Sequence, residues 1–208
     1  MPCLDKVYVV GHLPRGLTGI QHIPADDPYS NPVANTNHKV LVAAGAIQDE
    51  DSVLLCNDDF WLTATWDSDY CYYDSTLQVR LDENRASGDN YYRRALTRTR
   101  DWLAAMDGIG EALNFELHCP MPVRLEEVRK HIQESAEPLL PRSVLGNLGT
   151  FPCEPRQDHK IHRQWKSPPS WVRCVSADDH AIHSQYAKRW FSTKYPNMCR
   201  FETEEIVL

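Results

Sequence analysis

The chain has 208 residues, of which 42% are hydrophobic and 25% are charged, so it can bury the core of one domain. Its 22 Lys and Arg face 29 Asp and Glu, and the resulting net charge of -7 excludes a generally basic surface. Contact with nucleic acid therefore requires local basic patches. No stretch is long and apolar enough to predict a membrane span or a secretory leader, so we expect no membrane partner.

The seven cysteines are odd in number, and no two have the Cys-x-x-Cys spacing of a metal site or a redox pair. Several of them lie inside apolar runs. This pattern is typical of free thiols in a reducing compartment rather than of a disulfide framework, and it predicts a cytoplasmic protein.

The first part of the chain alternates apolar strands with a helix. Three strands are predicted, over residues 7–10, 19–23 and 52–56. Residues 32–46 have helical spacing of apolar side chains, with Pro32 near the start, where proline is tolerated. Strand, helix and strand joined by short loops favour an α/β fold with a mainly parallel central sheet flanked by helices.

The rest of the chain gives more scattered signals. Residues 69–89 are predicted to be irregular, and prolines interrupt the pattern beyond Pro138. Helices are expected over 91–106, 124–135 and 180–193, and strands over 115–120 and 172–175. We expect a single domain over residues 1–208, with a nucleotide-binding half of about 1–65 and an acceptor-binding, catalytic half of about 66–208.

Asp58 and Asp59 follow the predicted buried strand 52–56 and give the strongest chemical signal. Adjacent carboxylates repel each other unless a cation lies between them and a ligand, and Mg²⁺ or Mn²⁺ binds one or two carboxylates together with phosphate oxygens. Asn-Asp-Asp is also ordinary turn chemistry. Because apolar residues stand on both sides, we favour the interpretation of Asp58 and Asp59 as metal ligands, with Asp59 the more direct one.

Candidate catalytic residues lie in the second half. His118 precedes a proline at a predicted sheet edge, although a lone histidine is more often a hydrogen-bonded core residue. Arg142 can bind a phosphate through two hydrogen bonds, but its spacing alone favours a surface arginine. Asp178 and Asp179 precede the last predicted helix and can either supply a general base or cap that helix.

A further candidate carboxylate, Asp158, lies in the polar cluster 158–162. The spacing of His159 and His162 is compatible with zinc, but no cysteine pair accompanies them, which argues against a zinc site.

In the first half, the candidates for nucleotide contact are His12, Arg15, Asn35, Lys39, Asn57 and Asp58. The first four can equally be part of a polar surface. The sequence has neither a Walker loop nor a Gly-x-Gly-x-x-Gly segment, which argues against kinase-type and dinucleotide-binding proteins.

Taken together, the islands 7–14, 31–43 and 54–60 resemble the start and nucleotide site of GT-A-type glycosyltransferases. More narrowly, the order of motifs looks like that of the Stealth family of sugar-phosphate transferases. The motifs concerned are Asn57-Asp58-Asp59, His118-Cys119-Pro120, Arg142, Ser176-Ala177-Asp178-Asp179 and the segment 195–202. A similar layout occurs in compact phage glycosyltransferases associated with TET/JBP-type oxygenases.

The resemblance implies a GT-A-like domain and a metal-dependent glycosyltransferase that uses a nucleotide sugar, with a UDP-sugar the first choice. Asp58 and Asp59 would hold Mn²⁺ or Mg²⁺ and the sugar diphosphate. His118, Arg142 and Asp178 or Asp179 would line the reacting centre. The acceptor it suggests is 5-hydroxymethylcytosine in phage DNA, which would place the protein in the host cytoplasm.

Three alternatives stay open. The chain is much shorter than Stealth proteins and lacks their extra domains and membrane anchor, so transfer of hexose-1-phosphate to a glycan competes with transfer of the sugar alone. A metal-dependent hydrolase or nuclease would use the same paired carboxylates. A non-catalytic protein that binds a nucleotide sugar is the third.

Overall fold

The computed structural model describes residues 6–195 except 58, 67 and 165. Asp58, Cys3, Cys199 and residues 196–202 of the last motif therefore lie outside the described residues. The described chain is an α/β protein with seven α-helices and several small sheets. No described helix is long and apolar enough to cross a membrane. All five described cysteines are free thiols, as the sequence predicted.

The mainly parallel central sheet is not confirmed, because the described strands form five small sheets of mixed direction. β1 (Tyr8–Val10) pairs in parallel with β2 (Gln21–Ile23). β3 (Ser52–Leu55) instead pairs antiparallel with β8 (Met121–Arg124), a strand far along the chain. The helix between β2 and β3 therefore does not connect neighbouring strands of one sheet.

That helix, α1 (Pro32–Ala46), has the boundaries that the sequence predicted. Asn31 caps its start by accepting the backbone N–H of Val33 at 3.0 Å, and Pro32 occupies the first turn, where no N–H is needed. At its other end the guanidinium of Arg129 donates to the carbonyls of Ala44 and Ile47. A cation at this end complements the helix dipole.

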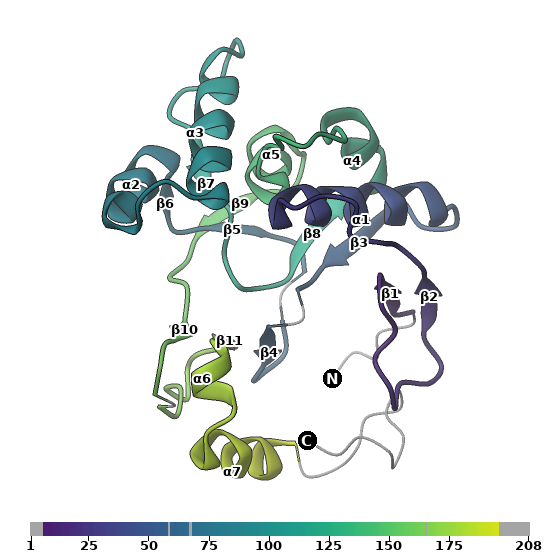
Figure 1. The fold of residues 1–208 in the computed structure, drawn as a ribbon, viewed down its shortest axis with the longest axis vertical. Coiled ribbons are helices and arrows are strands. Elements are labelled where there is room, and N and C mark those ends of the chain that lie inside the picture. Colours follow the sequence, from purple (N-terminus) through teal and green to yellow (C-terminus); the bar gives the residue numbers. More distant parts are fainter. Residues whose placement is uncertain (1–5, 58, 67, 165, 196–208) are drawn as a thin grey trace.

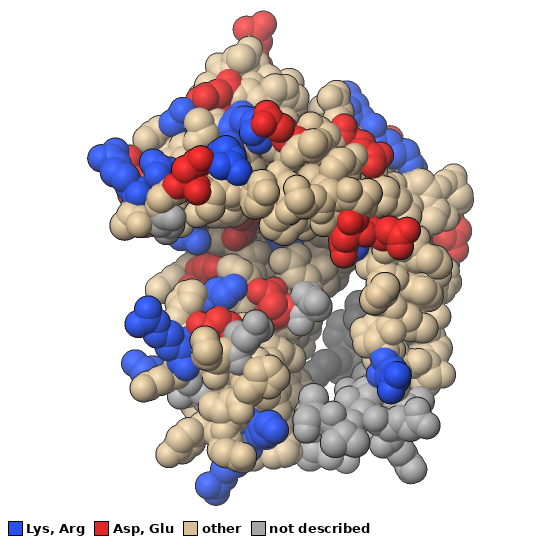
Figure 2. All heavy atoms as spheres, viewed as in Figure 1, with Lys and Arg blue, Asp and Glu red and all other residues tan. Residues whose placement is uncertain are grey.

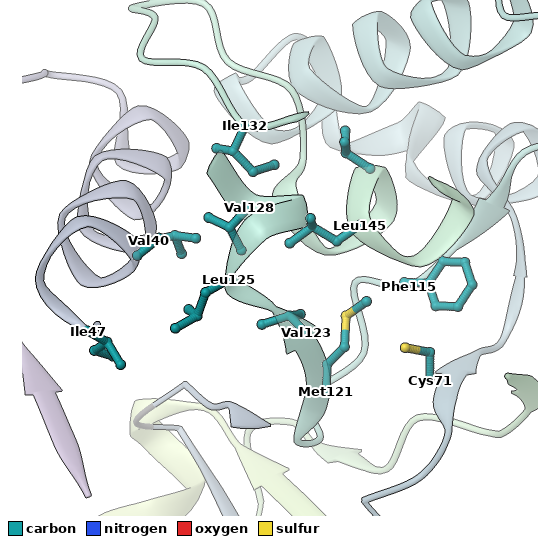
Figure 3. Packing of buried hydrophobic residues seen from close by; sticks show 12 residues of the cluster. Val40, Ile47, Cys71, Phe115, Met121, Val123, Leu125, Val128, Ile132 and Leu145 are labelled. Carbon is teal, nitrogen blue, oxygen red and sulfur yellow. The ribbon is translucent and has the colours of Figure 1, made fainter. Parts of the chain in front are cut away.

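The main hydrophobic core lies between α1, α4 (Leu125–His131), α5 (Pro141–Leu148) and β8 (Figure 3). Its buried side chains are Val40, Ala44, Ile47, Cys71, Phe115, Met121, Val123, Leu125, Val128, Ile132, Val144 and Leu145. This packing fixes the segment 115–120, which runs from the core to β8.

A second core joins α2 (Leu77–Glu83) to α3 (Tyr91–Ala104), with η1 (Asn84–Ser87) between them. Leu77, Leu96 and Leu103 are fully buried there. Two small sheets border this region. One pairs β5 (Cys71–Tyr73) with β9 (Cys153–Pro155), and the other pairs β6 (Ser75–Thr76) with β7 (Leu113–Asn114).

A separate lobe lies below helices α1 to α5 in the view of Figure 1. Its three-stranded sheet has β11 (Cys174–Ala177) between β10 (Lys160–Ile161) and β4 (Phe60–Leu62). Two helices follow, α6 (Asp179–Ile182) and α7 (Gln185–Lys194). We call β4 and residues 156–194 the lower lobe.

Several predicted elements are wrong in position or type. Residues 69–89, predicted to be irregular, contain β5, β6, α2 and η1, whereas 115–120, predicted to be a strand, form none. The helix expected over 124–135 ends at His131, and the late strand begins at Cys174 rather than residue 172. The last helix is interrupted, because Ser184 caps a new helix by accepting the N–H of Ala187.

Candidate functional site

One cleft of the described chain has a volume of about 530 Å³ and lies where the lower lobe meets β9 and α2. It is lined by Asp74, Arg80, His118, Pro155, Arg156, Gln157, Asp158, Lys160 and His162. The strand pairs β5–β9 and β10–β11 bring these distant segments together. The cleft therefore gathers two histidines, two carboxylates and three cationic side chains.

His118 and Asp158 form a bonded pair in this cleft. Nδ1 of His118 lies 2.7 Å from Oδ2 of Asp158, and the backbone N–H of His118 donates to Oδ1 at 3.2 Å. The two side chains are 21% and 16% exposed. Burial opposes the charge on Asp158, but the hydrogen bonds from His118 outweigh it and lower the pKa of this carboxyl. An ionised Asp158 keeps the proton on Nδ1 and leaves the lone pair on Nε2.

Lys160 and Asp59 lie on the other side of the His118 ring. Nζ of Lys160 is 2.9 Å from Nε2 of His118 and 3.3 Å from Oδ2 of Asp59. Nε2 of His118 is itself 3.6 Å from that carboxylate oxygen. The structure thus brings together three of the candidates predicted from the sequence, Asp59, His118 and Asp158. Lys160 lies with them, although no role of its own was predicted for it from the sequence.

Arg142 is buried beneath the site, with 5% of its surface exposed, so the surface position that its spacing favoured is wrong. Its guanidinium donates to three backbone carbonyls, at the end of β3 (Leu55) and at both sides of His118 (Phe115 and Cys119). The side chain does not line the cleft. Arg142 therefore positions the chain segments that carry His118 and the Asn57–Asp59 triplet.

Glu116 is a second group near His118 that sequence reasoning missed. Its carboxylate accepts the backbone N–H of Ser143 at 2.8 Å, in the first turn of α5. Burial raises the pKa of this carboxyl, although Arg142 and the Ser143 N–H oppose the shift. Glu116 also raises the pKa of Tyr92, which burial and this neighbouring charge bring to about 12.

Arg156 and Arg80 supply positive charge along the cleft. The Arg156 guanidinium lies 4.3 Å from the ring centre of Trp66 and 4.8 Å from that of Tyr72, in cation–π geometry. Arg80 comes from α2 and donates to Glu83 at 3.2 Å. Neither residue belongs to a recognisable motif; Arg156 follows β9, and its backbone N–H donates to Tyr73 of β5 at 2.7 Å, which helps to place it in the same cleft as His118.

Asp178 caps the helix that follows it, one of the two roles predicted for it. It accepts the N–H of Ala181 at 2.9 Å and that of Arg163 at 2.8 Å, and these bonds lower the pKa of its carboxyl. It is not among the residues that line the cleft. The side chain of Asp179 lies outside the described part, so its predicted role is not tested.

The nucleotide-binding candidates that the structure describes, which exclude Asp58, are also not among the cleft-lining residues. The Asn35 amide is bonded to both backbone groups of Tyr29, at 2.9 and 2.8 Å, and so closes the turn before α1. Lys39 forms an ion pair with Asp27 at 2.7 Å. His12 and Arg15 are exposed in the loop after β1, and Asn57 is exposed after β3.

Within the described residues, no group of three or more His, Cys, Asp or Glu is arranged to hold a metal ion. Asp58 lies outside those residues. The fit of a divalent cation can still be tested at Asp59, whose Oδ1 atom is buried without a hydrogen-bond partner in the described structure. A buried carboxylate oxygen in this condition can ligate a cation, so Asp59 fits a metal that a diphosphate would share.

The sequence matches no protein-family model and none of the curated proteins compared with it. The resemblance to GT-A and Stealth transferases therefore stays a prediction.

Proposed function

We propose that this chain is a transferase that acts on a nucleotide sugar, with His118 as the base at the reacting centre. One observation carries the proposal: the Asp158–His118 pair, bonded at 2.7 Å, opens onto a cleft lined by arginine and lysine. A carboxylate-oriented imidazole takes a proton from a hydroxyl group, and cations bind the phosphates of the donor. The resemblance of the Asn57–Asp59 region to GT-A-type glycosyltransferases points the same way.

In this proposal Nε2 of His118 accepts the proton of the acceptor hydroxyl. The hydroxyl oxygen forms a bond to the anomeric carbon, the bond from that carbon to the diphosphate breaks, and nucleoside diphosphate leaves. Negative charge develops on the departing diphosphate, where Lys160 and Arg156 stabilise it. Asp158 orients His118 and stabilises the imidazolium that forms.

Asp59, with Asp58, is the proposed site of Mn²⁺ or Mg²⁺. The Oδ1 atom of Asp59 is buried without a hydrogen-bond partner in the described structure, and this supports a metal site at Asp59. A divalent cation bound there would neutralise charge on the diphosphate. A GT-A-like arrangement, with the triplet at the end of β3, is part of the same proposal.

The proposed acceptor is a hydroxymethylated base in DNA. The net charge of the chain is -7, but residues 156–194 contain eight Lys and Arg against three Asp and Glu. Basic side chains lie along the outer edge of the lower lobe in Figure 2. A locally basic surface beside the cleft supports a polyanionic acceptor. Free thiols at the described cysteines suit the proposed cytoplasmic location.

Transfer of hexose-1-phosphate is a second candidate, favoured by one observation. Lys160 is 2.9 Å from the base itself, so the cleft can hold a phosphate next to Nε2 of His118. The acceptor oxygen would then form its bond to phosphorus rather than to carbon. The bond between the two phosphates would break, and nucleoside monophosphate would leave.

The experiment is a product assay with UDP-sugars and other nucleotide sugars, Mn²⁺, and three acceptors: hydroxymethylated DNA, unmodified DNA and a glycan. Nucleoside diphosphate with a heavier acceptor supports sugar transfer, whereas nucleoside monophosphate supports sugar-phosphate transfer. The His118→Asn variant is expected to lose the product, and His183→Asn, on an exposed histidine, is the matched control. Acceptor-independent release of free sugar, or no product at all, would overturn the proposal.

A further inference from the structure

Lys160 occupies the one ring nitrogen through which His118 could act as a base. Its Nζ lies 2.9 Å from Nε2, while Nδ1 of the same ring is bonded to Asp158 at 2.7 Å. The carboxylate keeps the proton on Nδ1, so Nε2 carries the lone pair and Lys160 donates to it. A lone pair that already accepts a hydrogen bond cannot take the proton of an acceptor hydroxyl.

The Lys160 ammonium contacts a carboxylate as well as the His118 ring. Oδ2 of Asp59 lies 3.3 Å from Nζ, and Lys160 pairs with Ser176 of β11, which fixes its backbone in the three-stranded sheet. The Lys160 side chain is 25% exposed and lines the cleft. An ammonium on a flexible four-carbon stem can therefore turn into the cleft while its backbone stays in place.

The cleft itself favours an anion. Its carboxylates are already engaged, since Asp158 accepts from His118, and Asp74 accepts from Asn114 at 2.8 Å and from Ser75 at 2.9 Å. Arg156 and Lys160 also line the cleft. Hydrogen bonds from an ammonium to phosphate oxygens are charge-assisted and stronger than one to a neutral imidazole nitrogen.

We propose that a phosphate-bearing ligand in this cleft draws the Lys160 ammonium away from His118 and thereby uncovers the base. Lys160 is then a phosphate-binding residue and a positioning residue at once. The base is available only when the donor is bound, which protects a bound acceptor from premature deprotonation. This inference rests on the proposed function for its purpose, but the displacement itself requires only an anion.

The test follows the ring nitrogens of His118 by ¹⁵N NMR in the full chain, with inorganic pyrophosphate as the probe. The His118→Asn variant assigns the resonance. Pyrophosphate is expected to shift the Nε2 resonance of His118 from the position of a hydrogen-bonded nitrogen to that of an unbonded nitrogen. The proton on Nδ1 is expected to stay in place. Binding of pyrophosphate without a change at Nε2 would overturn the proposal, and so would an absence of binding by calorimetry.

Lys160→Met removes the ammonium and keeps a side chain of similar length. In this variant the Nε2 resonance of His118 is expected at the unbonded position even without ligand. The affinity of the variant for pyrophosphate should fall about tenfold or more, as for loss of a hydrogen bond to a charged group. Lys130→Met, an exposed lysine of α4 outside the lower lobe, should behave as the unsubstituted chain. An Nε2 resonance that is the same in Lys160→Met and the unsubstituted chain would also overturn the proposal.

These measurements do not depend on turnover. A displaced Lys160 with no transfer of any sugar would refute the proposed function alone. Transfer with an unmoved Nε2 resonance would refute this inference alone.

Discussion

His118 and Asp158, 40 positions apart, are joined by two hydrogen bonds, one from the backbone N–H and one at Nδ1 of the ring. Both oxygens of the carboxylate are used, so the ring is fixed in rotation and in tautomer. The segment that carries His118 is held from below by Arg142, through the carbonyls of Phe115 and Cys119. The His118–Asp158 pair is therefore already in its bonded geometry before any substrate binds.

Asp158→Asn tests the orienting role of this carboxylate. The amide can donate to Nδ1, which favours the wrong tautomer, so kcat is expected to fall by about 10²–10⁴ with little change in the KM of the nucleotide sugar. Steady-state kinetics measure kcat and KM separately, with Asp82→Asn, at an exposed position of α2, as the control. A kcat equal to that of the unsubstituted chain would show that Asp158 does not orient a base.

Glu116→Gln tests the buried carboxyl behind His118. Burial raises the pKa of Glu116 above its ordinary value of 4.5, so the folded state binds the proton more tightly than the unfolded state. The stability that this group contributes is complete below the unfolded pKa and is lost as the pH rises through the folded pKa. Glutamine still accepts the Ser143 N–H but carries no charge, so the variant should gain stability over the unsubstituted chain as the pH rises.

Denaturant unfolding from about pH 4 to pH 8 measures this difference. The exposed Glu126→Gln variant is the control and should follow the unsubstituted chain throughout. Parallel stability curves for Glu116→Gln and the unsubstituted chain would show that the Glu116 pKa is not raised.

Arg142→Met tests the clamp beneath the site. The variant removes the guanidinium donor from the carbonyls of Leu55, Phe115 and Cys119, and it should lose about 3 kcal/mol of unfolding free energy. The exposed Arg85→Met is the matched control and should change stability by less than about 0.5 kcal/mol. If both variants unfold at the same denaturant concentration, Arg142 does not hold these segments.

Two glycines in helices allow a matched test of core packing. A Cβ at Gly146 of α5 would overlap the ring of Phe115, which is only 1% exposed, so Gly146→Ala should cost about 1–3 kcal/mol. A Cβ at Gly45 of α1 meets nothing within 4 Å, and Gly45→Ala should stabilise the helix by about 1 kcal/mol. Thermal unfolding measures both changes, and equal effects would contradict the packing described.

Local sequence signals predicted the elements whose reasons are local. α1 has a capping asparagine, a proline in the first turn and an apolar stripe, and its boundaries were predicted correctly. β3 is a short apolar run that ends before the acidic triplet, as predicted. The partner of each strand, and whether the two run parallel or antiparallel, could not be predicted in the same way. β3 pairs with β8, and β5 with β9, over long separations in the sequence.

The site was predictable in its parts but not in its assembly. His118 and Asp158 were both candidates, yet nothing in their spacing indicated that they bond each other. Arg142 was identified as a candidate phosphate ligand, whereas the structure uses its donors on backbone carbonyls. Lys160 acquires its place from the β10–β11 pairing, which depends on the whole lower lobe.

The most direct test of the central claim compares nucleotide binding with turnover in the unsubstituted chain and in His118→Asn. Calorimetry with UDP and Mn²⁺ measures binding, and acceptor-dependent release of UDP or UMP from a UDP-sugar measures turnover. We predict that His118→Asn keeps its affinity for UDP and loses turnover by about 10²-fold or more. Turnover that survives the substitution at full rate would contradict the assignment of His118 as the base.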